Sequence, residues 1–207
     1  MYTKMKGDAF ISSISDAYTI IIHICSFLEK FLLLYLVLVR FKHLNKKIAP
    51  NVLWNEERRE RNSITISDVR IMHSMLYDAI EAFNDIYRNP LMLSFISLLL
   101  RIVANFSIFR EEGLLIGSSF VSPPIMLILF ICTICHYTAE EANNIACVLS
   151  DGMTKLINSG NTPTKIAILT YFLHKCVSFD AARFFIIDLP LFHSIFAAIT
   201  TSFIILV

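Results

Sequence analysis

The sequence predicts an all-α, polytopic membrane protein, with four transmembrane helices and cytoplasmic amphipathic helices between them. Hydrophobic residues make up 56% of the 207 residues, and phenylalanine alone supplies 17 of them. Soluble domains are ordinarily about 45–50% apolar. Four apolar stretches also approach the length of about 20 residues that a helix needs to cross a bilayer. Because hydrocarbon offers backbone polar groups no water, each stretch is expected to be helical.

The predicted topology treats the whole chain, residues 1–207, as one membrane domain. The four predicted spans are residues 17–39, 91–109, 121–137 and 189–207. Residues 40–88 and 138–188 are predicted to be cytoplasmic, since the first of these segments is the most basic part of the chain and positive residues prefer that side. The loop before the third span has only Arg110 as a positive residue. The N-terminus and Val207 are therefore expected outside.

The cytoplasmic segments also carry helix signals. Ser67 is expected to cap a helix, with Asp68 favourably placed at its positive end. Apolar residues then recur at three- and four-residue steps, and Pro90 predicts a break before the second span. A further helix is predicted over residues 165–175.

The sequence contains little that favours catalysis or cofactor binding. The stretch "CTICH", Cys132 to His136, matches a haem-attachment pattern, but it lies inside an apolar span and has no charged neighbours. We interpret its cysteines as small hydrophobes. The chain has only five glycines and shows no phosphate loop, nucleophile elbow or metal-spaced His/Glu pair. We therefore expect no enzyme activity, no cofactor and no metal. A net charge of +1 also gives no field for nucleic acid.

Charged residues interrupt two of the predicted spans. Arg101 lies midway along the second span, where a charge is costly and should face protein or water. It is interpreted either as a cation that lines a cavity and contacts ligand, or as a structural ion pair or snorkelling side chain. Glu29 and Lys30 interrupt the first span. As adjacent residues they point to different faces of the helix, so this helix should pack against protein on more than one side.

The C-terminal stretch resembles the last segment of the insect gustatory receptors. That family typically shows Phe-Phe, then Asp, then LxxSIxAAxTTY, five hydrophobic residues and a final Gln-Phe. The residues that match are Phe184, Phe185, Asp188, Leu191, Ser194, Ile195, Ala197, Ala198, Thr200 and Thr201. Ser202 stands where the family usually has Tyr, and the chain ends one residue before the Gln-Phe.

Two more segments resemble the same family, in the expected order. One is a helix before the family's fifth span, matching at Arg70, His73, Leu76, Asn84 and Tyr87. The other is the inner end of the fourth span, matching at Arg40, Phe41, Leu44 and Asn45. The resemblance covers nearly the whole chain but only the back half of the family's length. The chain is therefore expected to be a C-terminal part of such a receptor.

The resemblance implies a seven-helix subunit, four of which form a cation channel gated by a small-molecule tastant. The seventh helix of the family is split. Its cytoplasmic half, about residues 163–179 here, would hold a homo- or hetero-tetramer together, and its outer half, residues 189–207, would line the pore. The implied location is the plasma membrane of sensory neurons, as a multi-pass protein in contact with lipid.

A pore-facing stripe is predicted on the last span. Helical spacing places Ser194, Ala198, Thr201 and Ile205 on one face, and pores gate by hydrophobic constriction. By resemblance, Ile205 falls where the related odorant co-receptor has a gate hydrophobe. Thr201 and Ile205 are the residues most expected to face the pore. The alternative is that the stripe only packs against a neighbouring helix.

The ligand pockets of the family lie in the outer half of the helix bundle. The residues of this chain expected there are Tyr18, His23, Arg101, Phe106 and Phe120. Two other functions remain open: an odorant receptor of the same superfamily, or an unrelated four-helix membrane scaffold or transporter. The alanines and threonines before the last hydrophobic run favour a gustatory receptor. A transporter should show paired repeats interrupted by Gly or Pro, and the sequence has none.

Overall fold

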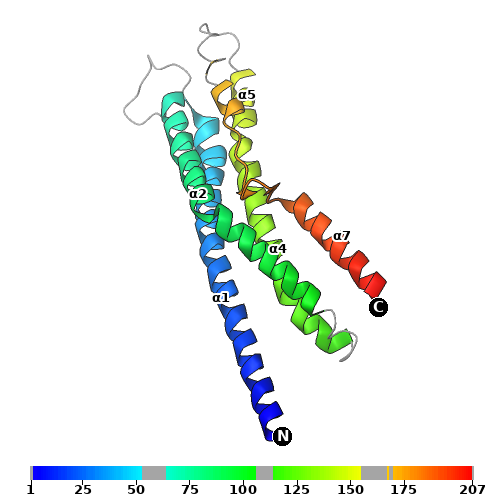
Figure 1. Cartoon of the computed structure of the whole chain (residues 1–207). Helices are drawn as coiled ribbons and strands as arrows, with labels where there is room; N and C mark the ends of the chain where they lie inside the picture. Colours follow the sequence, from blue (N-terminus) through cyan, green and yellow to red (C-terminus); the bar gives the residue numbers. More distant parts are fainter. Residues whose placement is uncertain (1, 53–63, 106–113, 155–166, 168–169, 207) are drawn as a thin grey trace.

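The computed structural model is built from long helices that cross and diverge along their length (Figure 1). It describes the backbone of residues 2–52, 64–105, 114–154, 167 and 170–206, with side chains from residue 18 to residue 204 except for 53–63, 106–117, 151–166 and 168–169. Its elements are α1 (Tyr2–His43), η1 (Leu44–Ile48), η2 (Ala49–Asn51), α2 (Ile66–Ala104), α4 (Leu114–Asn143), α5 (Ile145–Thr154), β1 (Asp180–Ala181), β2 (Phe185–Ile186) and α7 (Leu189–Leu206). The predicted all-α fold is confirmed, apart from a two-stranded antiparallel hairpin formed by β1 and β2.

Three helical stretches of the described chain are long and apolar enough to cross a membrane. They are Tyr18–Asn51, Ile66–Ala104 and Ser118–Ser150, and the shorter apolar stretch Leu189–Ile204 belongs to α7. A helix rises about 1.5 Å per residue, so α2, with its 39 residues, is about 58 Å long. That is nearly twice a hydrocarbon core of about 30 Å. Part of α2 must therefore extend beyond any bilayer that it crosses.

The first turn of α2 is capped by Thr65 and not by Ser67. The hydroxyl of Thr65 accepts from the backbone N–H of Asp68, and the Asp68 carboxylate accepts from the backbone N–H of Thr65 at 3.0 Å. This reciprocal pair is a capping box, which satisfies two backbone donors at once. The predicted cap was wrong by two residues because Ser67 has the same chemistry but lies inside the helix.

Pro90 bends α2 without ending it. Proline has no N–H and its ring crowds the preceding turn, so it kinks a helix interior. The structure runs helically through Pro90 to Ala104, and the hydroxyl of Ser94 donates to the Pro90 carbonyl at 2.8 Å. α2 accompanies α1 before the bend and approaches α4 after it (Figure 1). The predicted break is therefore a bend, because helical hydrogen bonds resume on both sides.

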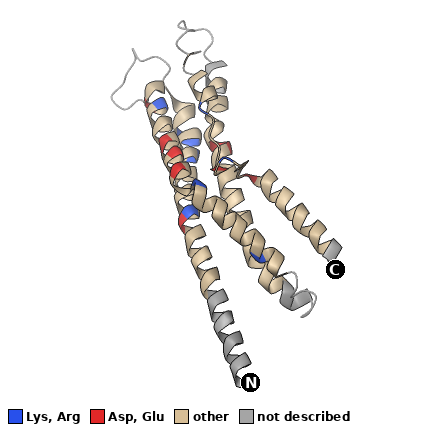
Figure 2. Cartoon of the chain, viewed as in Figure 1, with Lys and Arg blue, Asp and Glu red and all other residues tan. Residues whose placement is uncertain are grey.

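The main core lies where α1, α2 and α4 pack together. Its fully buried side chains include Leu34, Phe41, Phe95, Leu98 and Ile131. A second, smaller cluster joins η1 and η2 to α5 and the start of α2. In Figure 2 most of the acidic and basic residues lie in the half of the molecule that holds this smaller cluster, whereas α7 has none among its described residues. The largely uncharged half has the composition expected of lipid-facing helices.

Candidate functional site

The start of α7 is fixed by local capping. The carboxylate of Asp188 accepts from the backbone N–H of Leu191 at 2.8 Å, as an N-cap residue does. Pro190 follows in the first turn, where its missing N–H costs nothing. The helix then runs through eighteen mostly apolar residues to Leu206. Sequence alone therefore defines where this helix begins.

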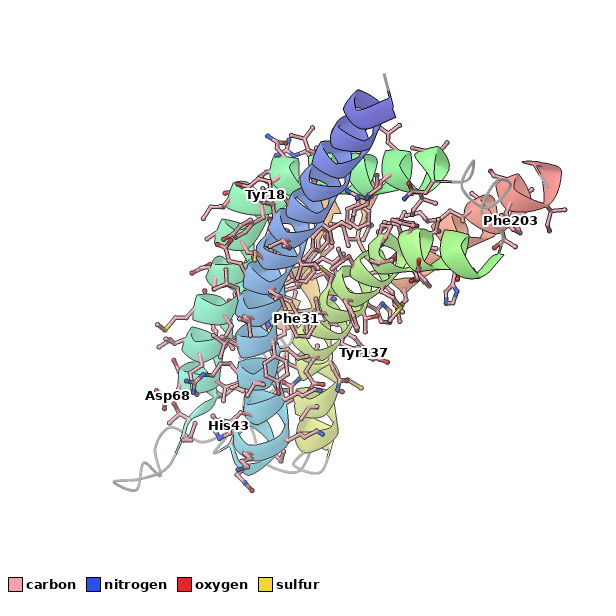
Figure 3. All side chains as sticks on the ribbon, turned by 90° about the horizontal axis from the view of Figure 1, so that it is seen from below. Tyr18, Phe31, His43, Asp68, Tyr137 and Phe203 are labelled. Atoms are coloured by element: carbon pink, nitrogen blue, oxygen red, sulfur yellow. The ribbon has the colours of Figure 1, made fainter. Side chains whose placement is uncertain are left out.

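α7 has one packed face and one open face. Leu191, Ile195, Ile199 and Phe203 are partly buried against the main core, and Figure 3 shows Phe203 close to the free end of the helix. The predicted stripe residues Ser194, Ala198 and Thr201 are exposed. The side chain of Ile205 lies outside the described residues.

The hydroxyls of the open face are satisfied within α7 itself. Ser194 Oγ donates to the Pro190 carbonyl at 3.0 Å, and Thr201 Oγ1 donates to the Ala197 carbonyl at 2.9 Å. Such bonds to the preceding turn let hydroxyls sit in an apolar helix without an unmet donor. Both residues remain exposed in the described part of the chain.

An apolar groove lies between α1 and α4. Its volume is about 440 Å³, within the usual range for small-molecule pockets. In Figure 3, Phe31 lies on the part of α1 that runs beside α4. Four residues of α1 and five of α4 line the groove: Ile24, Phe27, Leu28, Phe31, Pro123, Met126, Leu127, Phe130 and Ile131. None of them carries a polar side chain, so shape and dispersion contacts must dominate whatever binds there.

The ligand residues expected from sequence do not converge on this groove. Tyr18 and Phe120 are 65% and 45% exposed, on α1 and α4 respectively. Phe106 lies outside the described residues. The structure does bring His23 to α2, where its Nε2 lies 3.3 Å from Ser97 Oγ. Arg101 is one helical turn beyond Ser97 on the same face of α2 and is partly buried. His23 and Arg101 therefore belong to the contact between α1 and α2.

Sequence reasoning missed the groove residues for a physical reason. Phe27 and Phe31 are four residues apart on α1, as Met126 and Phe130 are on α4, so each pair shares a helix face. That spacing was a usable signal. Apolar residues cover most of the circumference of both helices, however, so periodicity could not single out the face that meets the other helix.

The charges within the first predicted span meet at one tyrosine of α2. Tyr87 donates its hydroxyl to Glu29 Oε1 at 2.8 Å, and Lys30 Nζ lies 5.3 Å from the centre of the same ring. Lys30 is only 2% exposed and donates to the carbonyl of Ser26 at 2.9 Å and to its hydroxyl. The prediction that this helix packs on more than one side is confirmed. Tyr87 can contact both charges because its hydroxyl donates to the Glu29 carboxylate while its ring faces the Lys30 ammonium group.

The cysteines of the haem-like pattern lie in the main core. Cys132 and Cys135 are both fully buried on α4. Among the residues that the structure describes, no group of three or more His, Cys, Asp or Glu side chains is placed to hold a metal ion. The two cysteines therefore act as packing residues in the part of α4 that faces α1 and α2.

One family model matches the chain, and two solved structures share its fold. Residues 9–207 match the family described as "7tm Chemosensory receptor". The fold resembles the insect olfactory receptor OR5 from Machilis hrabei, both alone (TM-score 0.68, 17% identity, 88% of this chain) and in complex with eugenol (TM-score 0.67, 16% identity, 87% of this chain). In both comparisons the match covers 47% of the receptor, so this chain spans about half its length. None of the curated protein sequences matches the chain.

Proposed function

Because the chain belongs to the 7tm chemosensory receptor family, which is a family of receptors and not a class of enzymes, we propose that it is a subunit of a ligand-gated cation channel that detects small-molecule tastants. The channel is a tetramer in the plasma membrane of sensory neurons. The subunit crosses the membrane at the four apolar spans, with residues 40–88 and 138–188 in the cytoplasm. About residues 163–179 contribute the contacts between subunits.

The two faces of α7 are the observation that carries this proposal. One face packs on the core of its own chain, and the other presents Ser194, Ala198 and Thr201, which are all exposed. Weakly polar hydroxyls and a small residue suit the wall of an aqueous path, whereas a helix buried in lipid needs neither. In a four-fold assembly this open face lines the pore, with Ile205 as the hydrophobic constriction.

The groove between α1 and α4 forms part of the ligand pocket. Its walls contain three phenylalanines and no hydrogen-bonding side chain, so it favours the apolar portion of a tastant. His23 and Arg101, at the contact between α1 and α2, supply the polar groups of this region. Tyr18, Phe106 and Phe120 do not line the groove itself; we propose that they contribute to the outer part of the pocket only in the assembled receptor.

An odorant receptor is the second candidate. The wholly apolar lining of the groove favours it, since a volatile ligand is small and mostly apolar. The solved receptor OR5, whose fold this chain resembles, was determined with eugenol. At 16% identity that likeness concerns the fold alone. The alanine and threonine pattern before the last hydrophobic run keeps the taste receptor as the first candidate.

The function is tested by recording ligand-gated current from cells that express the longest polypeptide its gene encodes. A panel of sugars, bitter compounds and volatile aromatics separates the two candidates by the class that opens the channel. For the groove, Leu28→Trp should shift the half-maximal ligand concentration, while Ile22→Trp, also exposed on α1 but on another face, should not. Current without any dependence on ligand would contradict the receptor proposal.

A matched pair of threonines tests the pore face. Thr201→Lys places a positive charge in the proposed cation path and should nearly abolish current at unchanged surface expression. Thr200→Lys is the control, because Thr200 is exposed on a different face and makes the same bond to its preceding turn at 2.8 Å. Equal loss from both variants would contradict a pore role for the Thr201 face.

A further inference from the structure

A short arm, residues 177–188, connects the core to α7 and is tied to two other helices. It begins at Val177, contains the hairpin of β1 and β2, and ends at the cap of α7, Asp188. The arm contacts α4 and α2 through hydrogen bonds and an ion pair as well as through apolar side chains. α7 packs on the main core along one face, and the arm fixes where and at what angle its first turn begins, so the arm helps to set the direction of α7.

The contact with α4 clamps the start of the arm. The side chain of Asn143 accepts from the Val177 N–H at 2.7 Å and donates to the Val177 carbonyl at 3.0 Å. An amide group that uses both its oxygen and its nitrogen on one residue fixes the direction of the backbone as well as its position. The arm therefore leaves α4 at a defined angle.

The contact with α2 follows one stripe of that helix. Asn84 donates to the Ser178 carbonyl at 2.9 Å, and Arg88, one turn further on, places its Nε 3.0 Å from Asp180 Oδ1. Both side chains of the Arg88–Asp180 pair are 22% exposed, so water screens the pair only partly. The Nε atom has no aligned hydrogen bond, which makes the contact an ion pair that tolerates small displacements.

The hairpin that carries Asp180 is stiff. Ala182 and Arg183 have positive φ angles of 50° and 62°, which residues other than glycine adopt at a cost. The turn is closed by Phe184 N–H donating to the Ala181 carbonyl at 2.9 Å and by Arg183 N–H donating to Asp180 Oδ1 at 2.8 Å. A stiff hairpin moves as a unit, so a displacement of Asp180 in β1 also displaces β2.

Aromatic contacts attach the arm on both sides of the bend in α2. Phe179 meets Phe83 edge to face with ring centres 5.9 Å apart, and Phe185 meets Phe95 in the same way at 5.8 Å. Phe83 precedes Pro90 and Phe95 follows it. A change in the bend of α2 would therefore displace the two ends of the hairpin relative to each other.

A polar cavity beside the ion pair gives the arm room to move. It has a volume of about 240 Å³ and is lined by residues of both the arm and α2, among them Asn84, Arg88, Asp180 and Arg183. A close-packed apolar contact at this place would resist displacement. An ion pair that borders a polar cavity offers less resistance, because the two side chains can separate into that space.

We propose that Arg88 is a positioning residue for channel opening: its ion pair with Asp180 couples the arm to α2, so that movement of α2 redirects α7. This inference rests on the proposed channel function. Arg88 touches neither the groove nor the open face of α7, so it acts only through the arm. The groove is lined by α1 and α4, and both of these helices pack against α2. In this proposal, ligand binding at the groove displaces α2, and the bend in α2 and the hairpin carry that displacement to α7.

Charge exchange tests the coupling. Arg88→Asp and Asp180→Arg should each raise the half-maximal ligand concentration roughly tenfold, because each exchange replaces a partly buried ion pair with two like charges at 22% exposure. The double exchange should restore most of the loss, which a variant that merely unfolds the chain would not show. Asp85→Asn is the control, since Asp85 lies 3.9 Å from Arg88 and is largely exposed.

A second readout does not depend on current. Thr201→Cys can be labelled with a maleimide polymer in membranes after Cys25, Cys147 and Cys176, the exposed cysteines, are changed to serine. The Asp180→Asn substitution in this background should change the labelling rate, since the direction of α7 changes. If the unaltered receptor gives no ligand-gated current but labelling shifts, the channel proposal fails and the coupling stands. Unchanged labelling with unchanged ligand sensitivity overturns the coupling.

Discussion

Asn143 of α4 holds Val177 through two hydrogen bonds, from the Val177 N–H at 2.7 Å and to its carbonyl at 3.0 Å. Val177 itself is buried in the main core. These two hydrogen bonds pair the backbone N–H and C=O of Val177, which lies outside any helix or strand. In a core without water such groups are costly to leave unpaired. Loss of this side chain should therefore measurably weaken the attachment of the arm.

Replacing Asn143 by alanine should lower the free energy of unfolding by about 1–3 kcal/mol, because two backbone groups lose their partner. Asn143→Asp keeps the acceptor for the Val177 N–H but loses the donor, so its loss of unfolding free energy should be smaller than that of Asn143→Ala. Thermal unfolding of the purified protein in detergent measures both. Asn144→Ala is the control, since Asn144 is the exposed neighbour. A larger effect at Asn144 than at Asn143 would contradict the clamp.

Thr65→Ala should destabilise the chain by about 0.5–2 kcal/mol, the usual range for the loss of an N-cap. The reason is that the hydroxyl of Thr65 and the carboxylate of Asp68 satisfy two donors of the first turn. Thr65→Ser should recover most of the loss. Ser67→Ala, the substitution at the residue that the sequence favoured, should change little. The measurement is the melting temperature of the unaltered protein and of the three variants under one condition. A larger loss for Ser67→Ala than for Thr65→Ala would contradict the cap at Thr65.

Ala182→Gly should stabilise the hairpin. Ala182 has a φ of 50°, and a left-handed conformation costs an L-residue roughly 1–2 kcal/mol that glycine avoids. The greater freedom of glycine in the unfolded chain offsets part of this gain, so a net rise of about 0.5–1 kcal/mol is expected. Ala197→Gly, in the middle of α7, should destabilise by about 0.5–1 kcal/mol. Thermal unfolding should therefore show a higher melting temperature for Ala182→Gly and a lower one for Ala197→Gly.

Lys30 and Tyr87 should show an interaction energy in a double-mutant cycle. The ammonium group lies 5.3 Å from the ring centre in a buried site, where a cation–π contact is worth about 0.5–2 kcal/mol. The cycle uses Lys30→Met and Tyr87→Leu, singly and together. Tyr87→Phe keeps the ring and loses only the bond to Glu29, which separates the two roles. Strict additivity of the single effects would show that the two side chains do not interact.

The sequence was most informative where structure is local. The spans are helical because apolar length and the need to pair every backbone group are properties of each segment alone. Sequence-based prediction was wrong at single positions. One is the helix cap, where Thr65 and Ser67 both have a hydroxyl and lie two residues apart. Another is Pro90, because whether a proline ends or bends a helix depends on what packs against the following turn.

Taken by itself, the sequence determined the all-α membrane fold and the family, and it predicted the stripe of Ser194, Ala198, Thr201 and Ile205 along the last helix. Only the tertiary structure decided which apolar faces of α1 and α4 form a groove, and that Glu29 and Lys30 share Tyr87. It alone decided that Asp180 meets Arg88. The physical reason is that these contacts join residues far apart in the chain. A helix that is apolar around most of its circumference leaves no pattern to say which face meets its neighbour.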